Sequence, residues 1–471
     1  MKEIPLFVDL DGTYTKTNLL LESFIIAIKK NPFVIFYCIS WLLKGKETLK
    51  YQLSELADID TNTLPLNPQF LSFLIEEKKK DRLIYLATAS NEKYAKDILN
   101  KTNIFDGYIS SCKKINLTGE KKLQKIKAIT YNYAYAGNEC IDFKIFEQAD
   151  QSLLVNPSAN VMRKARKLKI DRSFDVKKFD ISVWLKQFRT HQWLKNLLLF
   201  VPLVVSGRFA DLNDIMIIIY ALIAFNFLAS STYIINDLLD LESDRNHARK
   251  KSRPLAAGSI GIEEGTLASC LLLVFATSLS IFIGDEFTLV FISYLFLTLI
   301  YSFKLKRCLG IDVIFLAVLY TIRILAGAAA IGVTVSSWLL TFSGFLFLSL
   351  ALVKRCSEIQ LMNAERKKQI VGRAYSVEHY SILISFGISS AILAICIFFF
   401  YINNNILIGQ YSQPYILWLI FPALCYWLIR VWIKTFRGQM HDDPIEFSLK
   451  DKISLAIASF CGLIVIAAQV L

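Results

Sequence analysis

Residues 236–254 read NDLLDLESDRNHARKKSRP, and they follow an apolar run, residues 215–235, that is long enough to cross a lipid bilayer. Three carboxylates, those of Asp237, Asp240 and Asp244, open the stretch. Their spacing of three and four residues places them on one face if the helix continues. Carboxylates at the mouth of a membrane helix are costly unless they are paired or bound to a metal ion. The stretch therefore predicts a charged site where a membrane-spanning helix ends.

Two kinds of charge follow one another in this stretch. Carboxylate oxygens suit Mg²⁺, which proteins usually hold through a few carboxylates together with the phosphates of a substrate. Basic side chains come next and would bind such phosphates. They are Arg245, His247, Arg249, Lys250, Lys251 and Arg253. The alternative interpretation is a solvated helix end of mixed charge.

The same residues resemble a known signature. Asn236 and the three aspartates match the NDxxDxxxD motif of the UbiA superfamily of intramembrane prenyltransferases. The run DRNHARKKSRP is similar to the polyprenyl-phosphate phosphoribosyltransferase branch (decaprenyl-phosphate phosphoribosyltransferase-like), which reads close to DRxHPxKRxRP. Ala248 replaces the proline of this pattern, and Lys251 stands where arginine is usual. The resemblance implies an all-α bundle of nine transmembrane helices whose aspartates hold Mg²⁺ as the cofactor.

Composition supports a membrane protein. The 471 residues are 54% hydrophobic, and the mean hydropathy is +0.43. Basic cytosolic loops explain the net charge of +13, so we expect no nucleic-acid partner. The nine cysteines are scattered without a CxxC pair, as expected for reduced thiols. The first residues, MKEIPLFVDLDGT, do not read as a signal peptide, which predicts a cytosolic N-terminal part.

In residues 1–155, short apolar runs alternate with helical patterns. This alternation predicts a doubly wound α/β domain whose chemistry lies at the carboxyl ends of parallel strands. The first run ends in DLDGT, where Asp9 can form an aspartyl phosphate and Asp11 can shuttle the proton. These residues resemble the DxDGT motif of the haloacid dehalogenase (HAD) phosphatase superfamily. The resemblance implies a Rossmannoid fold, with Asp9 as the nucleophile and Asp11 as the general acid/base.

Three further positions are similar to HAD motifs. Thr88 matches the hydroxyl that binds the transferring phosphoryl group, and Lys122 matches the third-motif lysine, with Lys121 as the alternative. The fourth motif reads GNECID instead of GDxxxD, so Asn138 replaces a metal carboxylate. The Mg²⁺ ligands expected in this domain are Asp9, Asp11 and Asp142. A domain kept only for stability or docking is the alternative.

Residues 31–45, NPFVIFYCISWLLKG, lie after the first motif, where HAD proteins insert a helical cap. Their apolar core is too short to span a bilayer. The aromatic residues and flanking lysines are typical of a helix in the membrane interface, and a buried cap helix is the alternative. Residues 156–188 are basic and predict a linker into a membrane domain, residues 189–471.

The membrane domain contains nine apolar segments. They lie near 192–206, 214–236, 265–284, 286–303, 311–332, 337–353, 379–402, 413–432 and 453–471. Loops rich in Lys and Arg alternate with loops that carry almost none. By the positive-inside rule the basic loops are cytosolic, which predicts a cytosolic N-terminal domain and a C-terminus outside. The family resemblance implies the inner (plasma) membrane of a bacterium.

Further polar residues lie at the segment ends or inside the segments. Lys195 is expected to bind phosphate, whereas Trp193 is expected to anchor the chain at the interface. Arg323 lies within an apolar segment, and we expect it to line a pocket. The alternative is that it pairs two helices by contacting one of the carboxylates. Two other stretches, YSFKLKRCLGID and KRCSEI, are similar to patterns of the phosphoribosyltransferase branch. The matching residues, with implied substrate-binding roles, are Tyr301, Lys306, Asp312, Lys354, Arg355 and Glu358.

Charge also indicates the substrate. Aromatic prenyltransferases of the family carry a second acidic motif, DxxxD, whereas residues 354–373 are mostly cationic and lack it. We therefore expect phosphoribosyl pyrophosphate as donor and a polyprenyl phosphate lipid as acceptor, with Asn236, Lys250 and Arg253 among the substrate ligands. The HAD domain would then remove the 5-phosphate of the product. The alternative is an aromatic prenyltransferase that uses a prenyl diphosphate, with a non-catalytic HAD domain.

Overall fold

The computed structural model describes residues 4–113, 116–175, 179–247, 249–364, 375–403, 411–440 and 443–471. The chain divides into two compact units, Met1–Phe188 with Tyr233–Ala268, and Arg189–Thr232 with Ser269–Leu471. The stretch 236–254 therefore packs with the N-terminal part of the chain. Ala248 and most of the second half of the cationic loop, residues 365–373, lie outside the described residues.

A parallel sheet organises the first unit. Its strand order is β3-β2-β1-β4-β5-β6, and all five pairings are parallel. The strands are β1 Leu6–Val8, β2 Ile84–Asn91, β3 Gly107–Ser111, β4 Ala134–Gly137, β5 Gln151–Val155 and β6 Arg172–Phe174. In the centre, Phe7 of β1 lies opposite Tyr85 of β2 and Tyr135 of β4. The doubly wound α/β prediction is confirmed.

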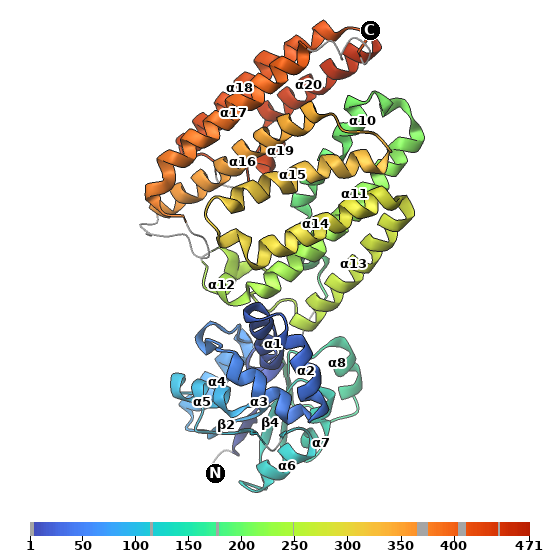
Figure 1. Ribbon diagram of the computed structural model, residues 1–471. Helices are drawn as coiled ribbons and strands as arrows, with labels where there is room; N and C mark the ends of the chain where they lie inside the picture. The colour runs from blue at the N-terminus through green and yellow to red at the C-terminus, as the bar shows by residue number, and fades with distance from the viewer. Residues whose placement is uncertain are drawn as a thin grey trace. The chain divides into compact units, whose positions relative to one another are not determined.

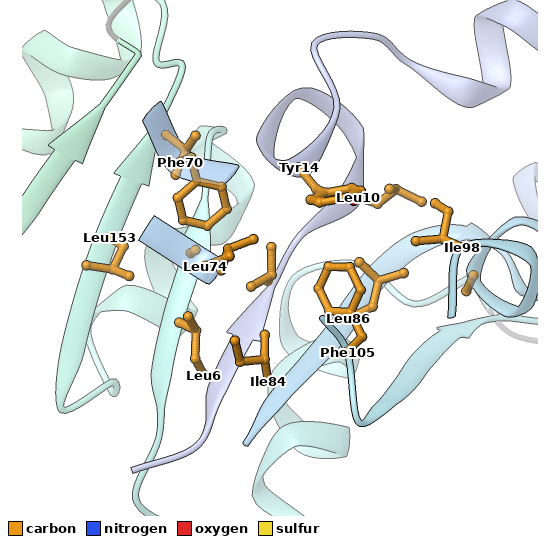
Figure 2. Close-up of a cluster of buried hydrophobic side chains, with 14 of the residues drawn as sticks. Leu6, Leu10, Tyr14, Phe70, Leu74, Ile84, Leu86, Ile98, Phe105 and Leu153 are labelled. Atoms are coloured by element: carbon orange, nitrogen blue, oxygen red, sulfur yellow. The ribbon is translucent and has the colours of Figure 1, made fainter. Parts of the chain in front are cut away.

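Helices cover both faces of this sheet, which is why the strands read as nearly continuous apolar runs. The hydrophobic cluster that contains Leu6 of β1 also contains side chains of α4 (Pro68–Lys79) and α5 (Glu92–Lys101), among them Phe70 and Ile98, which Figure 2 shows. Phe7 points to the other face, where it packs with three helices. They are α6 (Glu120–Lys127), α7 (Phe143–Phe146) and α8 (Ala159–Ala165).

Three helices are inserted after β1 and before α4. A tight turn, η1 (Leu10–Tyr14), leads into α1 (Leu19–Lys30), α2 (Val34–Leu43) and α3 (Lys46–Leu56). We call α1, α2 and α3 the cap helices, because they occupy the position at which a cap was expected. The basic stretch 156–188 is also structured, since it contributes α8, β6 and α9 (Ile181–Phe188).

Eight helices in the described part of the chain are long and apolar enough to cross a membrane. Figure 1 labels them: α11 Leu212–Leu239, α13 Ile262–Ile283, α14 Asp285–Phe303, α15 Ile311–Ala330, α16 Ser337–Ala364, α17 Tyr380–Ile402, α18 Ile420–Phe436 together with the preceding 3₁₀ helix η10 (Pro414–Leu419), and α20 Lys452–Val470. Our count of nine is therefore corrected at its first segment. Residues 192–206 fold as a 3₁₀ helix, η4 (Thr190–Phe200), followed by the short α10 (Val201–Val205). Pro202 at the start of α10 cannot donate a backbone hydrogen bond.

Small residues allow close packing in the second unit. A Cβ added to Gly327 of α15 would lie 2.1 Å from the carbonyl oxygen of Leu199 in η4. No real Cβ approaches an oxygen so closely, so the glycine is needed for the contact. Small residues at helix contacts are typical of membrane bundles, where close backbone approach replaces the hydrophobic effect as the driving force.

We expect Gly327→Ala to lower the thermal unfolding midpoint of the detergent-solubilised protein by several degrees. Overpacking a helix contact costs about 1–3 kcal/mol. Gly344→Ala in α16 is the matched control, because its added Cβ would meet no atom within 4 Å. Equal midpoints for the two variants, measured by fluorescence-detected size exclusion after heating, would contradict this packing.

Candidate functional sites

The first candidate site lies at the carboxyl ends of three adjacent strands in the first unit. Asp9 directly follows β1, Thr88 lies in β2, and Asn138 directly follows β4. Because β2, β1 and β4 are parallel neighbours, these ends meet at one edge of the sheet. Asp11 lies in the η1 turn just beyond Asp9. The DLDGT residues therefore have the strand-end position expected from the sequence.

Lys122 completes this site from α6. Its Nζ lies 3.0 Å from Oδ1 of Asp9 and 3.6 Å from Oδ1 of Asp142, and it donates a 3.0 Å hydrogen bond to Oη of Tyr135. Tyr135 in turn donates to Oδ1 of Asp142 at 2.8 Å. The ammonium group of Lys122 that contacts Asp9 is thus held in place by the buried phenol of Tyr135 and the buried carboxylate of Asp142. This arrangement favours a positioning role for Asp142. Lys121, the alternative, lines a neighbouring cavity.

Burial governs the electrostatics of the two aspartates. It raises the pKa of Asp9 to about 7, with Lys122 acting in the opposite direction. Burial also raises the pKa of Asp11, while hydrogen bonds from the backbone N–H of Leu19 (2.8 Å) and from the hydroxyl of Ser90 favour its charged form. Paired carboxylates in such surroundings are typical of catalytic sites.

Asn138 packs against the η1 turn. Its Oδ1 accepts a hydrogen bond from Thr13 Oγ1 at 3.3 Å. A Cβ on Gly12, whose φ is +75°, would lie 2.1 Å from the Asn138 amide nitrogen, so only glycine fits there. The side-chain amide of Asn138 therefore places an oxygen next to the turn that follows Asp9, but this amide carries no negative charge. Among the described residues, no three His, Cys, Asp or Glu side chains are grouped so as to hold a metal ion.

Sequence reasoning missed Lys50 of cap helix α3. Its Nζ donates to the carbonyl oxygen of Ala89 at 2.8 Å and to Asn116 Oδ1 at 2.9 Å. Burial lowers the pKa of Lys50, and the nearby carboxylate of Asp11 acts in the opposite direction. A cavity of about 590 Å³ adjoins this position and is lined by Lys46, Glu47, Asn116, Thr118, Glu120, Lys121 and Gln124. No sequence pattern signalled this residue, because only the tertiary placement of the cap brings it to the strand ends.

The second candidate site is the aspartate-rich stretch at the end of α11. This helix stops at Leu239, and α12 (Leu241–Arg245) follows directly. Nη1 of Arg253 lies 3.0 Å from Oδ1 of Asp237 and 2.5 Å from Oδ2 of Asp244. The two carboxylates thus converge on one cation, but the helix does not continue through Asp240, so the predicted face shared by all three aspartates does not form. Burial raises the pKa of Asp244, and Arg253 opposes this shift.

Other groups complete the surroundings of these carboxylates. Gln187 Nε2 donates to Oδ2 of Asp237 at 3.0 Å, and Nζ of Lys250 lies 4.0 Å from Asp244. Asp240 pairs instead with Lys29 of cap helix α1, at 3.1 Å. The position between Asp237 and Asp244 is therefore suited to a positively charged group. The ligand atoms around it are carboxylate oxygens, which Mg²⁺ prefers.

The second unit contains a buried carboxylate that sequence reasoning also missed. Oδ2 of Asp443 accepts hydrogen bonds from Lys195 (2.8 Å), Lys354 (2.9 Å) and the hydroxyl of Tyr320 (2.9 Å). Burial alone would raise the pKa of Asp443, but the two lysines hold it well below its usual range. Asp443 caps α19 (Pro444–Lys450), and only that local role is visible in the sequence.

A second cluster of that unit joins residues from the two stretches that resemble the phosphoribosyltransferase branch. Nε of Arg355 lies 2.7 Å from Oδ2 of Asp312, and the guanidinium also pairs with Glu358. Nη2 of Arg355 donates to the hydroxyl of Tyr301 at 3.3 Å. Lys306 lies on the short 3₁₀ helix η7 (Leu305–Arg307). The fully buried Arg355 and Asp312 therefore form an ion pair within the bundle.

Arg323 forms a hydrogen-bond network among buried polar groups. Its Nε donates to Asn196 Oδ1 and its Nη2 to Tyr294 Oη, both at 2.8 Å, and Nη1 donates to the carbonyl of Leu319. Asn196 also donates to Asn226 at 2.8 Å. The hydrogen-bond partners of Arg323 are thus an amide, a phenol and a carbonyl group, which favours helix pairing through neutral groups over pairing with a carboxylate.

Comparison with known proteins defines the family. The model of the UbiA prenyltransferase family matches residues 198–450. An uncharacterized protein, y4nM, of Sinorhizobium fredii (strain NBRC 101917 / NGR234) is 34% identical over 462 residues, which cover 97% of this chain and 90% of that protein. The chain belongs to the UbiA prenyltransferase family. It is therefore an integral membrane transferase, as its apolar helices require.

Named relatives cover smaller parts of the chain. The decaprenyl-phosphate phosphoribosyltransferase of Mycolicibacterium smegmatis is 36% identical over 190 residues, which cover 40% of this chain and 59% of that enzyme. The 4-hydroxybenzoate octaprenyltransferase of Shewanella halifaxensis is 30% identical over 162 residues, covering 34% and 56%.

Two solved structures show a distant similarity to the chain. A UbiA homolog from Archaeoglobus fulgidus bound to GPP and Mg²⁺ has a TM-score of 0.47 at 20% identity, and covers 60% of this chain and 99% of that one. A HAD family hydrolase from Salmonella enterica has a TM-score of 0.28 at 15% identity, covering 39% and 73%.

We expect Asp312→Asn to lower the stability of the protein by about 3–5 kcal/mol, because it removes the fully buried one of the two carboxylates that pair with the buried guanidinium of Arg355. Glu120→Gln is the control, since it removes an exposed pair with Lys144 that should contribute little. Thermal unfolding in detergent measures both. An unchanged midpoint for Asp312→Asn would show that this carboxylate is available to a ligand instead of serving the bundle.

Proposed function

We propose that this protein transfers a phosphoribosyl group from phosphoribosyl pyrophosphate to a polyprenyl phosphate, with Mg²⁺ as cofactor. The observation that carries the proposal is the convergence of Asp237 and Asp244 on one cationic position at the end of α11. Its partner, Arg253, ends the run DRNHARKKSRP that is similar to the phosphoribosyltransferase pattern. Similarity to the mycobacterial decaprenyl-phosphate phosphoribosyltransferase supports this donor and acceptor.

In the proposed site, Asp237 and Asp244 hold the metal ion, with Asn236 and Asp240 helping. When bound, Mg²⁺ neutralises the diphosphate of the donor as that group departs. Arg253, which lies between the two carboxylates, and Lys250, which lies 4.0 Å from Asp244, would bind the diphosphate of the donor. The bond between the anomeric carbon and the diphosphate breaks, and an oxygen of the lipid phosphate forms the new bond.

No strong base is needed in this reaction, because the attacking phosphate is already anionic. Catalysis then rests on positioning and charge neutralisation. In the second unit, Lys195 and Lys354 share the single carboxylate of Asp443, so that cluster keeps a net positive charge. We propose these lysines, together with Lys306, as ligands for substrate phosphates.

The N-terminal site is proposed to remove the 5-phosphate from the resulting lipid-linked ribose phosphate. Asp9 attacks the phosphorus atom, the sugar oxygen leaves with a proton from Asp11, and water then hydrolyses the aspartyl phosphate. Lys122, held at 3.0 Å from Asp9, neutralises the transferring group. Thr88 and Lys50 supply donors from β2 and from the cap. Asn138, as a neutral ligand, makes the metal site weaker than a carboxylate would.

The orientation proposed for the chain keeps the basic loops and the N-terminal unit in the cytosol of a bacterium, with the C-terminus outside the plasma membrane.

The similarity to an octaprenyltransferase supports a second candidate, transfer of a prenyl group from a prenyl diphosphate to an aromatic acceptor. The two candidates differ in their donor, so one assay separates them.

We expect Asp237→Asn to reduce lipid labelling from labelled phosphoribosyl pyrophosphate by about 100-fold or more, because the metal site loses a charged ligand. The assay uses the full-length protein in membranes with Mg²⁺ and a polyprenyl phosphate, followed by organic extraction. Asp285→Asn, an exposed acid at the start of α14, is the control and should retain activity. Labelling from a prenyl diphosphate instead would favour the aromatic prenyltransferase.

We expect Lys122→Met to leave the extracted lipid product heavier by one phosphate group, because the attack by Asp9 loses its charge partner and slows about 100-fold or more. Lys121→Met, one residue earlier on α6, should give the same product as the unsubstituted protein. Mass spectrometry of the lipid phase reports both. A dephosphorylated product from Lys122→Met would remove this lysine from the mechanism, and a phosphorylated product from the unsubstituted protein would remove the phosphatase step.

A further inference from the structure

Cap helix α2 carries an exposed apolar surface that its neighbours do not cover. Phe36 is 67% exposed and Leu43 is 85% exposed, which is unusual for side chains of this size. The surface, which we call the α2 surface, consists of Phe33, Ile35, Phe36, Tyr37, Ile39, Leu42 and Leu43. Burial of such a surface would be strongly favourable, so its exposure points to a binding partner.

The same helix is firmly held on its other side. Val34 is buried with Ala27 of α1 and Leu53 of α3, and Cys38 and Trp41 pack against this cluster. The α2 surface is therefore the outward face of an ordered helix and not part of a loose segment. At ten residues, α2 is about 15 Å long and cannot span a bilayer about 30 Å thick.

Charge around the α2 surface has one sign. Lys29, Lys30, Lys44 and Lys46 flank the helix, and no acidic residue lies between Glu22 and Glu47. Aromatic side chains bordered by lysines match the interface of a membrane that contains anionic lipids, where rings sit at the headgroups and lysines meet phosphates. A second copy of this chain would bring like charges together across a two-fold axis, which disfavours a symmetric dimer here.

The α2 surface is also tied to the end of a membrane helix within the first unit. Nζ of Lys29 donates to the carbonyl oxygen of Leu239 at 2.6 Å, and it pairs with Asp240 at 3.1 Å. Leu239 is the last residue of α11, which is long and apolar enough to cross a membrane. Because α2 begins only a few residues after Lys29, it stays close to a point where the chain leaves the bilayer.

We infer that α2 lies in the cytosolic headgroup region of a membrane that contains anionic lipid, with the α2 surface against the acyl boundary. The contact of Lys29 with the end of α11, in the same unit, keeps the helix near the bilayer, so insertion needs no separate encounter. This inference does not depend on the proposed transferase reaction. The cap would then have two roles. Helix α2 would bind the membrane. Helix α3, next to α2, brings Lys50 to the site of Asp9, where phosphate groups carried by lipids would enter.

Photocrosslinking tests the inference in the full-length protein. Benzoylphenylalanine replaces Phe36 in protein reconstituted into nanodiscs of phosphatidylglycerol and phosphatidylcholine. After illumination we expect a lipid adduct on the peptide that contains position 36, detected by mass spectrometry. Benzoylphenylalanine at Tyr131, which is 83% exposed on another surface of the unit, is the matched control and should give none.

Two results would overturn the inference: no lipid adduct at position 36, or an adduct with a second copy of the chain. A charge-reversed variant tests the lipid chemistry. Lys30→Glu combined with Lys44→Glu should lower the lipid adduct at position 36 several-fold in anionic nanodiscs, while the exposed Lys144→Glu should not change it. Equal yields from all three proteins would show that anionic headgroups do not hold α2.

Discussion

Compensation of buried carboxylates by cations is the interaction on which the functional parts of this protein depend. Asp9 has Lys122, Asp312 has Arg355, and Asp443 has two lysines. Burying an isolated carboxylate is too costly to be tolerated, so each charge requires a partner brought from another element. The same pairs keep charged groups inside apolar surroundings, where they act more strongly on phosphates than they would in water.

Arg253 shows the same compensation for two carboxylates at once. Its guanidinium lies between the carboxylates of Asp237 and Asp244 and holds the two side chains close together. In the proposed site, a guanidinium that leaves this position would keep its charge and would be available to a phosphate oxygen.

The fold was largely predictable where local patterns dominate. Buried strands ending in DLDGT, and apolar runs of membrane length, follow from the period and length of the hydrophobic pattern. Residues 192–206 were misread, because hydropathy does not distinguish a 3₁₀ helix from an α-helix. Lys50 and Asp443 could not be foreseen, since their partners lie at least 39 residues away along the chain and no spacing rule connects them.

Ion pairs also join the cap to the aspartate-rich stretch inside the first unit. Arg245 donates to both carboxylate oxygens of Glu22, and both side chains are buried, while Lys29 pairs with Asp240. Such contacts contribute less net stability than an apolar contact of equal area, because both charges must lose water. They fix orientation more strictly, since a bidentate pair tolerates little displacement. The pairs that Glu22 and Lys29 of α1 form with Arg245 and Asp240 therefore set the register between the cap and the aspartate-rich stretch, and a mismatch there would break both ion pairs.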